Sequence, residues 1–467
     1  MKIYEKSVSE TNGKKVCMVN DAESGEDFIY APQKLGFKGK NDGENVLAPL
    51  NHETAETLRS LFPFTAPVRV LGRDRSFGVG DRLGIAAPGH IAVFQKYDAY
   101  PVLAQQSIRE LNLTNRTYED VLDCVTFAVF REGYKKGFGA DGDHLKTPED
   151  IEYALSLGFT MITLDCSEHI KNGVTDESVK NFEIPVCYKE KYLGKVFDIG
   201  EGETVAFTET ELAKILVIYG EAVDFAKEMY FRFWRDGKYN ADFEISIDET
   251  ETPTTPHQHF FVANELSEAG VEIATMAPRF CGEFQKGIDY IGDLNLFEAE
   301  MKVHAQLARH FGYKLSIHSG SDKFSTFPVI CRETRGRFHV KTAGTNWLEA
   351  MRVVAECDPA LYREVHKYAL SAFSEATKYY HVTTVLSNIP CIDSLSDSEL
   401  PALFEQNDAR QLIHITYGLI LNKKRADGIY EFKDRLYKLW EEHSEEYKAA
   451  LMRHIGRHLE LLGVREM

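Results

Sequence analysis

The feature that most constrains the fold is a repeated alternation of strand-like and helix-like segments. A run of small and apolar residues over 138–144 is followed by a helical segment, 148–157, with Thr147 placed as its N-cap. Gly158 ends that segment, and a second apolar run covers 159–164. Strand, helix and strand in this order predict a βαβ unit, in which the two strands run parallel.

The same alternation continues through most of the chain. We expect further strands at 68–72, 91–94, 242–247, 271–276, 314–318 and 338–342, and helices at 103–112, 118–134, 210–235, 256–268 and 296–311. About eight such units over roughly 300 residues favour a closed (β/α)8 TIM-type barrel over an open doubly wound sheet. No glycine-rich dinucleotide or P-loop motif follows a strand, so we do not expect a nucleotide-binding fold.

The regions flanking the barrel differ in composition. Residues 1–65 are polar and rich in Gly, Asn and Asp, which predicts an N-terminal extension. The barrel is expected over 66–390, with a glycine-punctuated insertion at 167–207 that could reach over the active-site mouth. Residues 391–467 are rich in Glu, Lys and Leu and predict a helical subdomain.

Charge and cysteine usage narrow the class of protein. The net charge is −18, with 72 acidic and 54 basic residues and no basic stripe, which argues against nucleic-acid binding. The eight cysteines form no CxxC pair, as in a reduced cytoplasmic protein. With neither a signal peptide nor an apolar run of about 20 residues, no membrane association is expected. The oligomeric state is left open.

Two segments place a histidine where a strand passes into a loop. Residues 139–144 end in Asp143 and His144, and residues 315–322 contain His318. In barrel enzymes the chemistry lies at the ends of the strands. Adjacent side chains on a strand point in opposite directions, but a bend at its end could bring both members of the Asp-His pair over one cavity.

The polar pattern of a third segment, 243–249, also points inward. If its isoleucines face the surrounding helices, Glu244, Ser246 and Asp248 face the interior and Glu249 begins the loop at the rim. Unpaired burial of such side chains is costly, which favours a functional explanation for the group.

By the same alternation, His318, His339 and Lys341 point into the barrel. Four strands would then direct acids, imidazoles and one amine to a single cavity. We expect His144 and His318 to bind a divalent metal cation such as zinc, manganese, cobalt or nickel, which accept imidazole together with oxygen ligands.

The third metal ligand is less well defined. Glu283 is the first choice, because its loop follows the predicted strand 271–276, which precedes the strand of His318. His259 and His339 are alternatives. For His259, and for His257 beside it, a packing or capping role in the first turns of a helix is the more frequent one.

These motifs resemble those of the class II, metal-dependent ketose-bisphosphate aldolases. The similarity covers roughly residues 135–345 and rests on four motifs in the same order: Asp143-His144-Leu145, 159–169, 244–249 and 317–321. The family's middle metal histidine has no counterpart, since 279–283 stands in its place. The bisphosphate-binding strand is replaced by 339–345, which points to a different substrate.

Over its whole length, including 70–78 and 139–147, the chain is more similar to the bacterial tagaturonate/fructuronate epimerase family. That resemblance implies an isomerase that interconverts two hexuronate ketoses with a divalent metal. It implies metal ligands at His144 and His318, a proton acceptor at Asp143 and a proton donor at Glu249.

The chemistry of these ketoses explains why such residues are required. The two sugars differ at a carbon β to the ketone, whose C–H is not acidic, so enolisation cannot invert it. Retro-aldol cleavage followed by re-addition to the other face of the aldehyde can, given a Lewis acid and acid/base groups on both faces. Asp143 and Glu249 could act as the acid/base groups on the two faces. Lys341 or Arg279 could bind the substrate carboxylate, although Lys341 could equally pair with an interior acid.

Two other functions are compatible with the sequence. A class II aldolase or another sugar isomerase could use the same barrel, and release of three-carbon products would identify an aldolase. A carbohydrate-binding protein without turnover is a further alternative, against which the full set of Asp143, His144, Glu249 and His318 argues.

Overall fold

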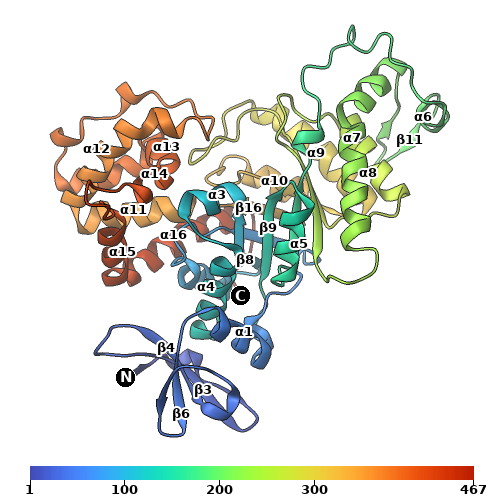
Figure 1. The fold of residues 1–467 in the computed structure, drawn as a ribbon. Helices are drawn as coiled ribbons and strands as arrows, with labels where there is room; N and C mark the ends of the chain where they lie inside the picture. Colours follow the sequence, from blue (N-terminus) through green and yellow to red (C-terminus); the bar gives the residue numbers. More distant parts are fainter.

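The computed structural model describes residues 1–467 and is built around a closed barrel of eight parallel strands surrounded by helices (Figure 1). This architecture confirms the predicted fold class. In barrel order the strands are β7 (Arg75–Val79), β8 (Tyr100–Ser107), β9 (Gly139–Leu145), β10 (Met161–Asp165), β13 (Asp242–Ile247), β14 (Thr275–Pro278), β15 (Lys314–Ile317) and β16 (Phe338–Thr342). The barrel closes where β16 pairs with β7.

The barrel helices begin with strong capping signals. Thr117, Thr208 and Thr255 each form a capping box, in which the threonine side chain and the third helical residue satisfy each other's exposed backbone donors. The helices next to the strands are α2 (Ala87–Lys96), α3 (Ile108–Thr114), α4 (Tyr118–Glu132), α5 (Pro148–Ser156), α7 (Glu209–Phe233), α8 (Pro256–Glu268), α9 (Leu294–Phe311) and α10 (Phe327–Glu333).

Three predicted elements near the start of the barrel were wrong. The segment 68–72 is not a strand; the first barrel strand, β7, begins at Arg75. The apolar run 91–94 lies inside α2, since a short buried run does not by itself distinguish strand from helix. The expected helix 103–112 is divided between β8 and α3, with Ser107 as the N-cap of α3.

The N-terminal residues form a small antiparallel sheet at one end of the barrel (Figure 1). It consists of β1 (Lys2–Ile3), β2 (Ser9–Thr11), β3 (Lys14–Asn20), β4 (Asp27–Pro32), β5 (Lys40–Asp42) and β6 (Asn45–Pro49), followed by α1 (His52–Leu61). The sheet has its own core, to which Phe127 and Phe130 of α4 contribute. This shared core fixes the sheet to the barrel.

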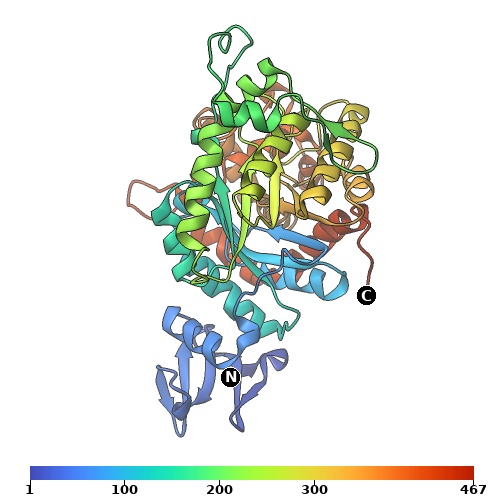
Figure 2. The same cartoon turned by 90° about the vertical axis from the view of Figure 1, so that its right-hand side faces the viewer.

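The segment between β10 and α7 lies at the edge of the molecule in Figure 1, where α6 and β11 are labelled, and faces the viewer in Figure 2. It contains α6 (Val186–Tyr192) and a two-stranded hairpin of β11 (Phe197–Asp198) and β12 (Thr204–Val205). Tyr192 packs against Phe197, Phe207 and Phe261, so aromatic contacts hold the segment against α8.

The C-terminal helices form a second core beside the barrel (Figure 1). They are α11 (Thr345–Cys357), α12 (Pro359–Ala376), α13 (Asn407–Ile415), α14 (Tyr417–Asn422), α15 (Lys433–Glu442) and α16 (Ser444–Leu461). This core already includes α11 and α12, upstream of the expected boundary at 391. The last helix, α16, returns to pack on α2 of the barrel. None of the helices is both long and apolar enough to cross a membrane.

Candidate active site

A polar cavity of about 650 Å³, counted to its open mouth, lies at the C-terminal ends of the barrel strands. Of its 18 lining residues only Ala343 is hydrophobic. Such a lining suits a small, highly hydroxylated or charged ligand and not an apolar one. Asp143, His144, Asp248 and Glu249 are among the residues that line it, together with His318 and Lys341.

An irregularity in β9 brings Asp143 and His144 to the cavity together. Between two aligned positions, β9 has one more residue than β10, because Gly142 pairs with Ile162 and Leu145 with Leu164. This β-bulge re-aims the side chains at the end of the strand. His144 also has a left-handed backbone with φ 57°, a strained conformation that occurs preferentially at functional sites.

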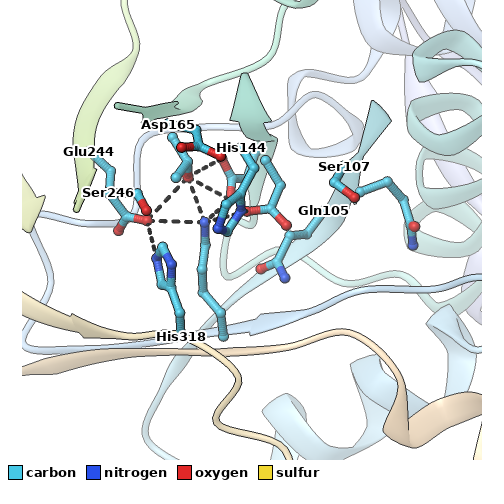
Figure 3. Close-up of polar contacts among 12 residues, drawn as sticks. Gln105, Ser107, His144, Asp165, Glu244, Ser246 and His318 are labelled. Atoms are coloured by element: carbon cyan, nitrogen blue, oxygen red, sulfur yellow. Dashed lines mark hydrogen bonds and ion pairs between the residues drawn. The ribbon is translucent and has the colours of Figure 1, made fainter. Parts of the chain in front are cut away.

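The two site histidines lie side by side, with ring centroids 4.9 Å apart. His144 Nδ1 donates to Asp143 Oδ1 at 2.7 Å, and His318 Nε2 donates to Glu244 Oε1 at 2.8 Å, as Figure 3 shows for the latter pair. Each carboxylate accepts a hydrogen bond from one nitrogen of its imidazole and so orients the ring, which leaves the other ring nitrogen to bind a metal ion once it is deprotonated. Carboxylate-oriented imidazoles of this kind are typical of metal-binding histidines.

The geometry also fits a metal ion between these histidines. One nitrogen each of His144 and His318 and one oxygen of Asp248 lie within 4.8 Å of one another. His318 Nδ1 is buried and has no hydrogen-bond partner, although Asp248 Oδ1 lies 3.2 Å away. Two imidazoles and a carboxylate form a suitable donor set for a borderline divalent ion. A second arrangement of ligand atoms combines His144 with Asp165 and Glu249.

Lys341 is the centre of a buried ion-pair network beneath the two histidines. Its Nζ donates to Asp141 Oδ2 and Asp143 Oδ1, both at 2.7 Å, and to Glu244 Oε1 at 3.0 Å. Thr163 Oγ1 is a further partner. The ammonium group is therefore already engaged by three carboxylates, which argues against the predicted role of Lys341 in binding a substrate carboxylate.

The charges in this network shift the pKa values of its members. Burial alone would raise the pKa of Asp143, but Lys341 and His144 hold it well below its usual range. Burial would likewise raise the pKa of Asp248, which His318 and His144 lower instead. For Asp141, burial raises the pKa to about 7, with Lys341 opposing and Asp143 adding to the rise. Asp143 and Asp248 are thus ionised at neutral pH.

The structure does not bring Glu283 or Arg279 to the cavity. The loop after β14 folds back on itself, with Glu283 and Ile291 exchanging backbone hydrogen bonds of 2.8 and 3.2 Å. This pairing holds Glu283 away from the barrel axis. Asp248, which the strand pattern already placed in the interior, occupies the position next to the two histidines that Glu283 was expected to take.

The alternative third ligands are engaged elsewhere. His259 contacts His304 Nδ1 at 2.8 Å and the Tyr313 hydroxyl at 2.5 Å, in a buried group between α8, α9 and strand β14. His339 pairs with Ser76 Oγ at 3.0 Å, and burial lowers its pKa to about 3. Neither belongs to a group of ligand atoms suited to a metal.

Several residues of the cavity had no signal in the sequence analysis. They are Arg82, Gln105, Ser107, Arg109, Glu110, Lys286 and His414. The polar residues at the end of the apolar run 102–107 could have identified Gln105 and Ser107, had that run been assigned to a strand. The others come from loops, a short helix and the C-terminal helices, where no periodicity indicates which side chain faces the barrel.

Comparisons with known proteins agree with this architecture. Residues 4–462 match the model of the tagaturonate epimerase (UxaE) family. A tagaturonate/fructuronate epimerase of Thermotoga maritima is 44% identical over 475 residues, which cover 98% of this chain and 96% of that protein. The glycerol-bound and native crystal structures of the fructuronate-tagaturonate epimerase of Cohnella laeviribosi are 50% identical, with TM-scores of 0.96 and 0.95. Each covers 99% of this chain, which spans 97% and 96% of those structures.

Proposed function

The chain belongs to the tagaturonate epimerase family, and from this premise we infer that it is an isomerase that interconverts tagaturonate and fructuronate. We further propose that inversion proceeds by retro-aldol cleavage and re-addition within the polar cavity. The observation that supports this mechanism best is the pair of carboxylate-oriented histidines beside Asp248, with Asp143 and Glu249 in the same cavity.

His144, His318 and Asp248 are the proposed ligands of a divalent cation such as zinc, manganese, cobalt or nickel. When bound, such an ion supplies a Lewis acid for the substrate oxygen on which negative charge develops. Asp141, Asp143, Glu244 and Asp248 stand against the single fixed cation of Lys341, and this excess of negative charge favours cation binding. Asp143 and Glu244 hold the two imidazoles in the orientation that binding requires.

The acid/base steps are assigned to two carboxylates, one on β9 and one in the loop after β13. Asp143 is ionised and accepts the proton of the hydroxyl group on the carbon that inverts. Loss of that proton turns the C–O bond into a carbonyl, the adjacent C–C bond breaks, and its electron pair forms an enediolate on the ketone half. After the aldehyde half has turned over, the same bond re-forms and Glu249, which lines the same cavity, donates a proton to the new alkoxide. In the reverse reaction the two groups exchange roles, so that Glu249 accepts the hydroxyl proton and Asp143 donates one.

The buried network beneath the site supports Asp143. Both of its ion pairs, with His144 and Lys341, involve Oδ1, so that Oδ2 is left for the substrate hydroxyl. Charge-assisted contacts of this length restrict the carboxylate to one orientation. The contacts with Lys341 and His144 therefore fix the orientation of the Asp143 carboxylate.

The experiment that tests this proposal combines metal analysis with substrate turnover. The purified protein is expected to contain a divalent metal and to convert tagaturonate into fructuronate, and chelation should abolish both the metal content and the conversion. Asp143→Asn should retain metal at saturating ion concentration and lose about 10²- to 10⁴-fold in kcat. His144→Ala should lose both metal and turnover.

Two results would contradict the mechanism. A full rate in Asp143→Asn would rule out Asp143 as the proton acceptor. Accumulation of free three-carbon products by the wild-type protein, without the epimer, would indicate an aldolase on the same barrel. The first result tests the role assigned to Asp143, and the second tests the reaction itself.

A further inference from the structure

The cavity has a second, cationic end that the proposed chemistry does not use. Four of its lining residues carry a permanent or readily gained positive charge: Arg82, Arg109, Lys286 and Lys341. Lys341 is saturated by the three carboxylates described above. The remaining three lie with His414 on the side of the cavity formed by α3, the loop after β14 and the C-terminal helices.

Arg82 also forms its polar contacts with other residues of the protein. Its guanidinium pairs with Glu110 through contacts of 3.0 and 2.9 Å, donates to the backbone oxygen of His414 and stacks 3.9 Å from the Tyr417 ring centroid. The side chain is almost completely buried. A guanidinium held on several sides in this way acts as fixed positive charge at the cavity wall.

Arg109 and Lys286, in contrast, have no carboxylate partner. Lys286 Nζ donates to Ser319 Oγ at 3.1 Å, and the guanidinium of Arg109 lies 5.1 Å from the Tyr380 ring centroid; neither forms an ion pair. Burial, and then the neighbouring Arg109, lower the pKa of Lys286. Positive charge is therefore in local excess at this end of the cavity, although the protein as a whole carries −18.

His414 provides an independent sign of a missing ligand. It is fully buried, lines the cavity, and has no hydrogen-bond partner on either ring nitrogen. The His414 ring packs directly against Gly287 and Gly344, where a larger residue would not fit. A Cβ on Gly287 would lie 2.8 Å from His414 Nδ1, and a Cβ on Gly344 would overlap the ring. An unpaired buried imidazole is costly unless something else completes its hydrogen bonds.

We propose that Arg109, Lys286 and His414 form the subsite that binds the carboxylate of the hexuronate. A carboxylate accepts several hydrogen bonds, so it can pair with both free cations and with an N–H of the imidazole at once. This assignment rests on the proposed function, and it replaces Lys341 and Arg279 as the expected carboxylate-binding groups. It also gives the C-terminal helical region a part in substrate recognition, through His414 on α13.

The subsite has a consequence for the retro-aldol step. When the bond next to the inverted carbon breaks, the carboxylate belongs to the aldehyde half, and the enediolate half remains at the metal-ligand end of the cavity. The aldehyde half must turn over without leaving. Anchoring its carboxylate allows the aldehyde carbon to rotate about the adjacent single bond while the other end of the fragment stays bound.

The test compares anionic and neutral sugars in the intact protein. Titration calorimetry measures binding of tagaturonate and of D-tagatose, its neutral counterpart with CH2OH in place of the carboxylate. Lys286→Gln and Arg109→Gln should each weaken tagaturonate binding about 10- to 100-fold, as for loss of a charge-assisted hydrogen bond. Binding of D-tagatose should change by less than about threefold, and Lys286→Arg should restore most of the discrimination.

Turnover provides a second measurement on the same variants. Lys286→Gln should release more dihydroxyacetone and three-carbon aldehyde acid per epimerisation event than the wild type, because the aldehyde half is held less firmly. Lys302→Gln removes an exposed, unpaired lysine on α9 and is the matched control, with no change expected in either measurement.

The outcomes separate the subsite from the family activity. If the wild type epimerises tagaturonate but Lys286→Gln and Arg109→Gln weaken both sugars equally, the subsite is overturned and the proposed function stands. If tagaturonate binding depends on the two cations but no epimer forms, the subsite stands and the proposed function fails. Loss of discrimination in Arg279→Gln instead would return the assignment to the loop after β14.

Discussion

Two clusters in this protein each combine one aspartate with two histidines, but only one of them lines the polar cavity. The mouth cluster consists of His144, Asp248 and His318. The strap cluster consists of Asp322, His454 and His458, and it joins the loop after β15 to the last helix, α16. In both clusters one ligand atom per residue lies within 4.8 Å of the others, so distance alone would nominate both for metal binding.

The difference lies in how many of these atoms already have partners within the protein. In the strap cluster, His458 Nε2 accepts from the backbone N–H of Asp322 at 3.0 Å, and His458 Nδ1 donates to the backbone oxygen of His454 at 2.8 Å. Asp322 pairs with Arg410 at 2.9 Å and with His454 at 2.8 Å. A metal ion would have to displace the two hydrogen bonds of His458, whereas His318 Nδ1 in the mouth cluster has no hydrogen-bond partner. We therefore expect the strap cluster to serve stability and the mouth cluster to serve the proposed chemistry.

The largest expected effect comes from replacing the mouth carboxylate. Asp248→Asn should lower the metal content and reduce turnover about 10³-fold or more, since a Lewis acid contributes several kcal/mol to such a transition state. The metal-free protein should lose some thermal stability, because His318 and His144 lower the pKa of Asp248 and so stabilise its ionised form in the fold. Metal analysis, fructuronate formation and thermal unfolding of the metal-free protein measure the three quantities. Full metal content in this variant would remove Asp248 from the ligand set.

The same substitution in the strap cluster should act on stability instead. Asp322→Asn leaves Arg410 buried without its counter-charge and His454 with Glu349 alone, and breaking such a buried pair costs about 3–5 kcal/mol of unfolding free energy. Denaturant unfolding measures the loss. Metal content and kcat per folded molecule should remain within a few-fold of the wild type.

An Asp322→Asn variant that loses its metal without loss of stability would reverse the distinction between the two clusters. Asp248→Asn is its matched control, because both substitutions replace one aspartate by asparagine beside two histidines. The two variants should differ in metal content, which only Asp248→Asn should lower.

The smallest expected effect is a pH dependence specific to the strap cluster. Burial, then His454, and also Lys323 lower the pKa of His458 from 6.5 to about 3, with Asp322 opposing. The folded protein thus holds this imidazole neutral, and the stability it contributes is complete above pH 6.5 and is lost as the pH falls towards 3. Between pH 7 and 5.5 this amounts to about 1 kcal/mol.

His458→Gln keeps an acceptor for the Asp322 N–H but cannot be protonated. Its unfolding free energy should therefore fall about 1 kcal/mol less than that of the wild type between pH 7 and 5.5, in parallel denaturant titrations. Equal acid sensitivity of the two proteins would show that His458 is not held neutral by the fold.

The sequence predicts the regular parts of this molecule well. The βαβ unit over 138–164 is present, and the Thr147 side chain accepts from the backbone N–H of Asp150 as expected of an N-cap. Strand alternation correctly directs Glu244 and Lys341 into the barrel, where they form an ion pair. These features depend on local periodicity and capping, which a single sequence contains.

What the sequence does not contain is the path of the loops. Glu283 and Lys286 are three residues apart in one loop, and only the backbone pairing between Glu283 and Ile291 decides that the lysine and not the glutamate lines the cavity. His414 reaches the cavity from a helix whose place is fixed by packing against other C-terminal helices. Such placements arise from tertiary contacts between distant segments, for which periodicity gives no indication.

The strap has a further consequence for how the protein is made. Asp322 follows His318 by four residues, yet its partner histidines lie about 130 residues further along the chain. The barrel strands are all synthesised by Thr342, about 110 residues before His454 is available. A nascent chain can therefore close its barrel early, but the loop that bears His318 is fixed only after α16 has been synthesised.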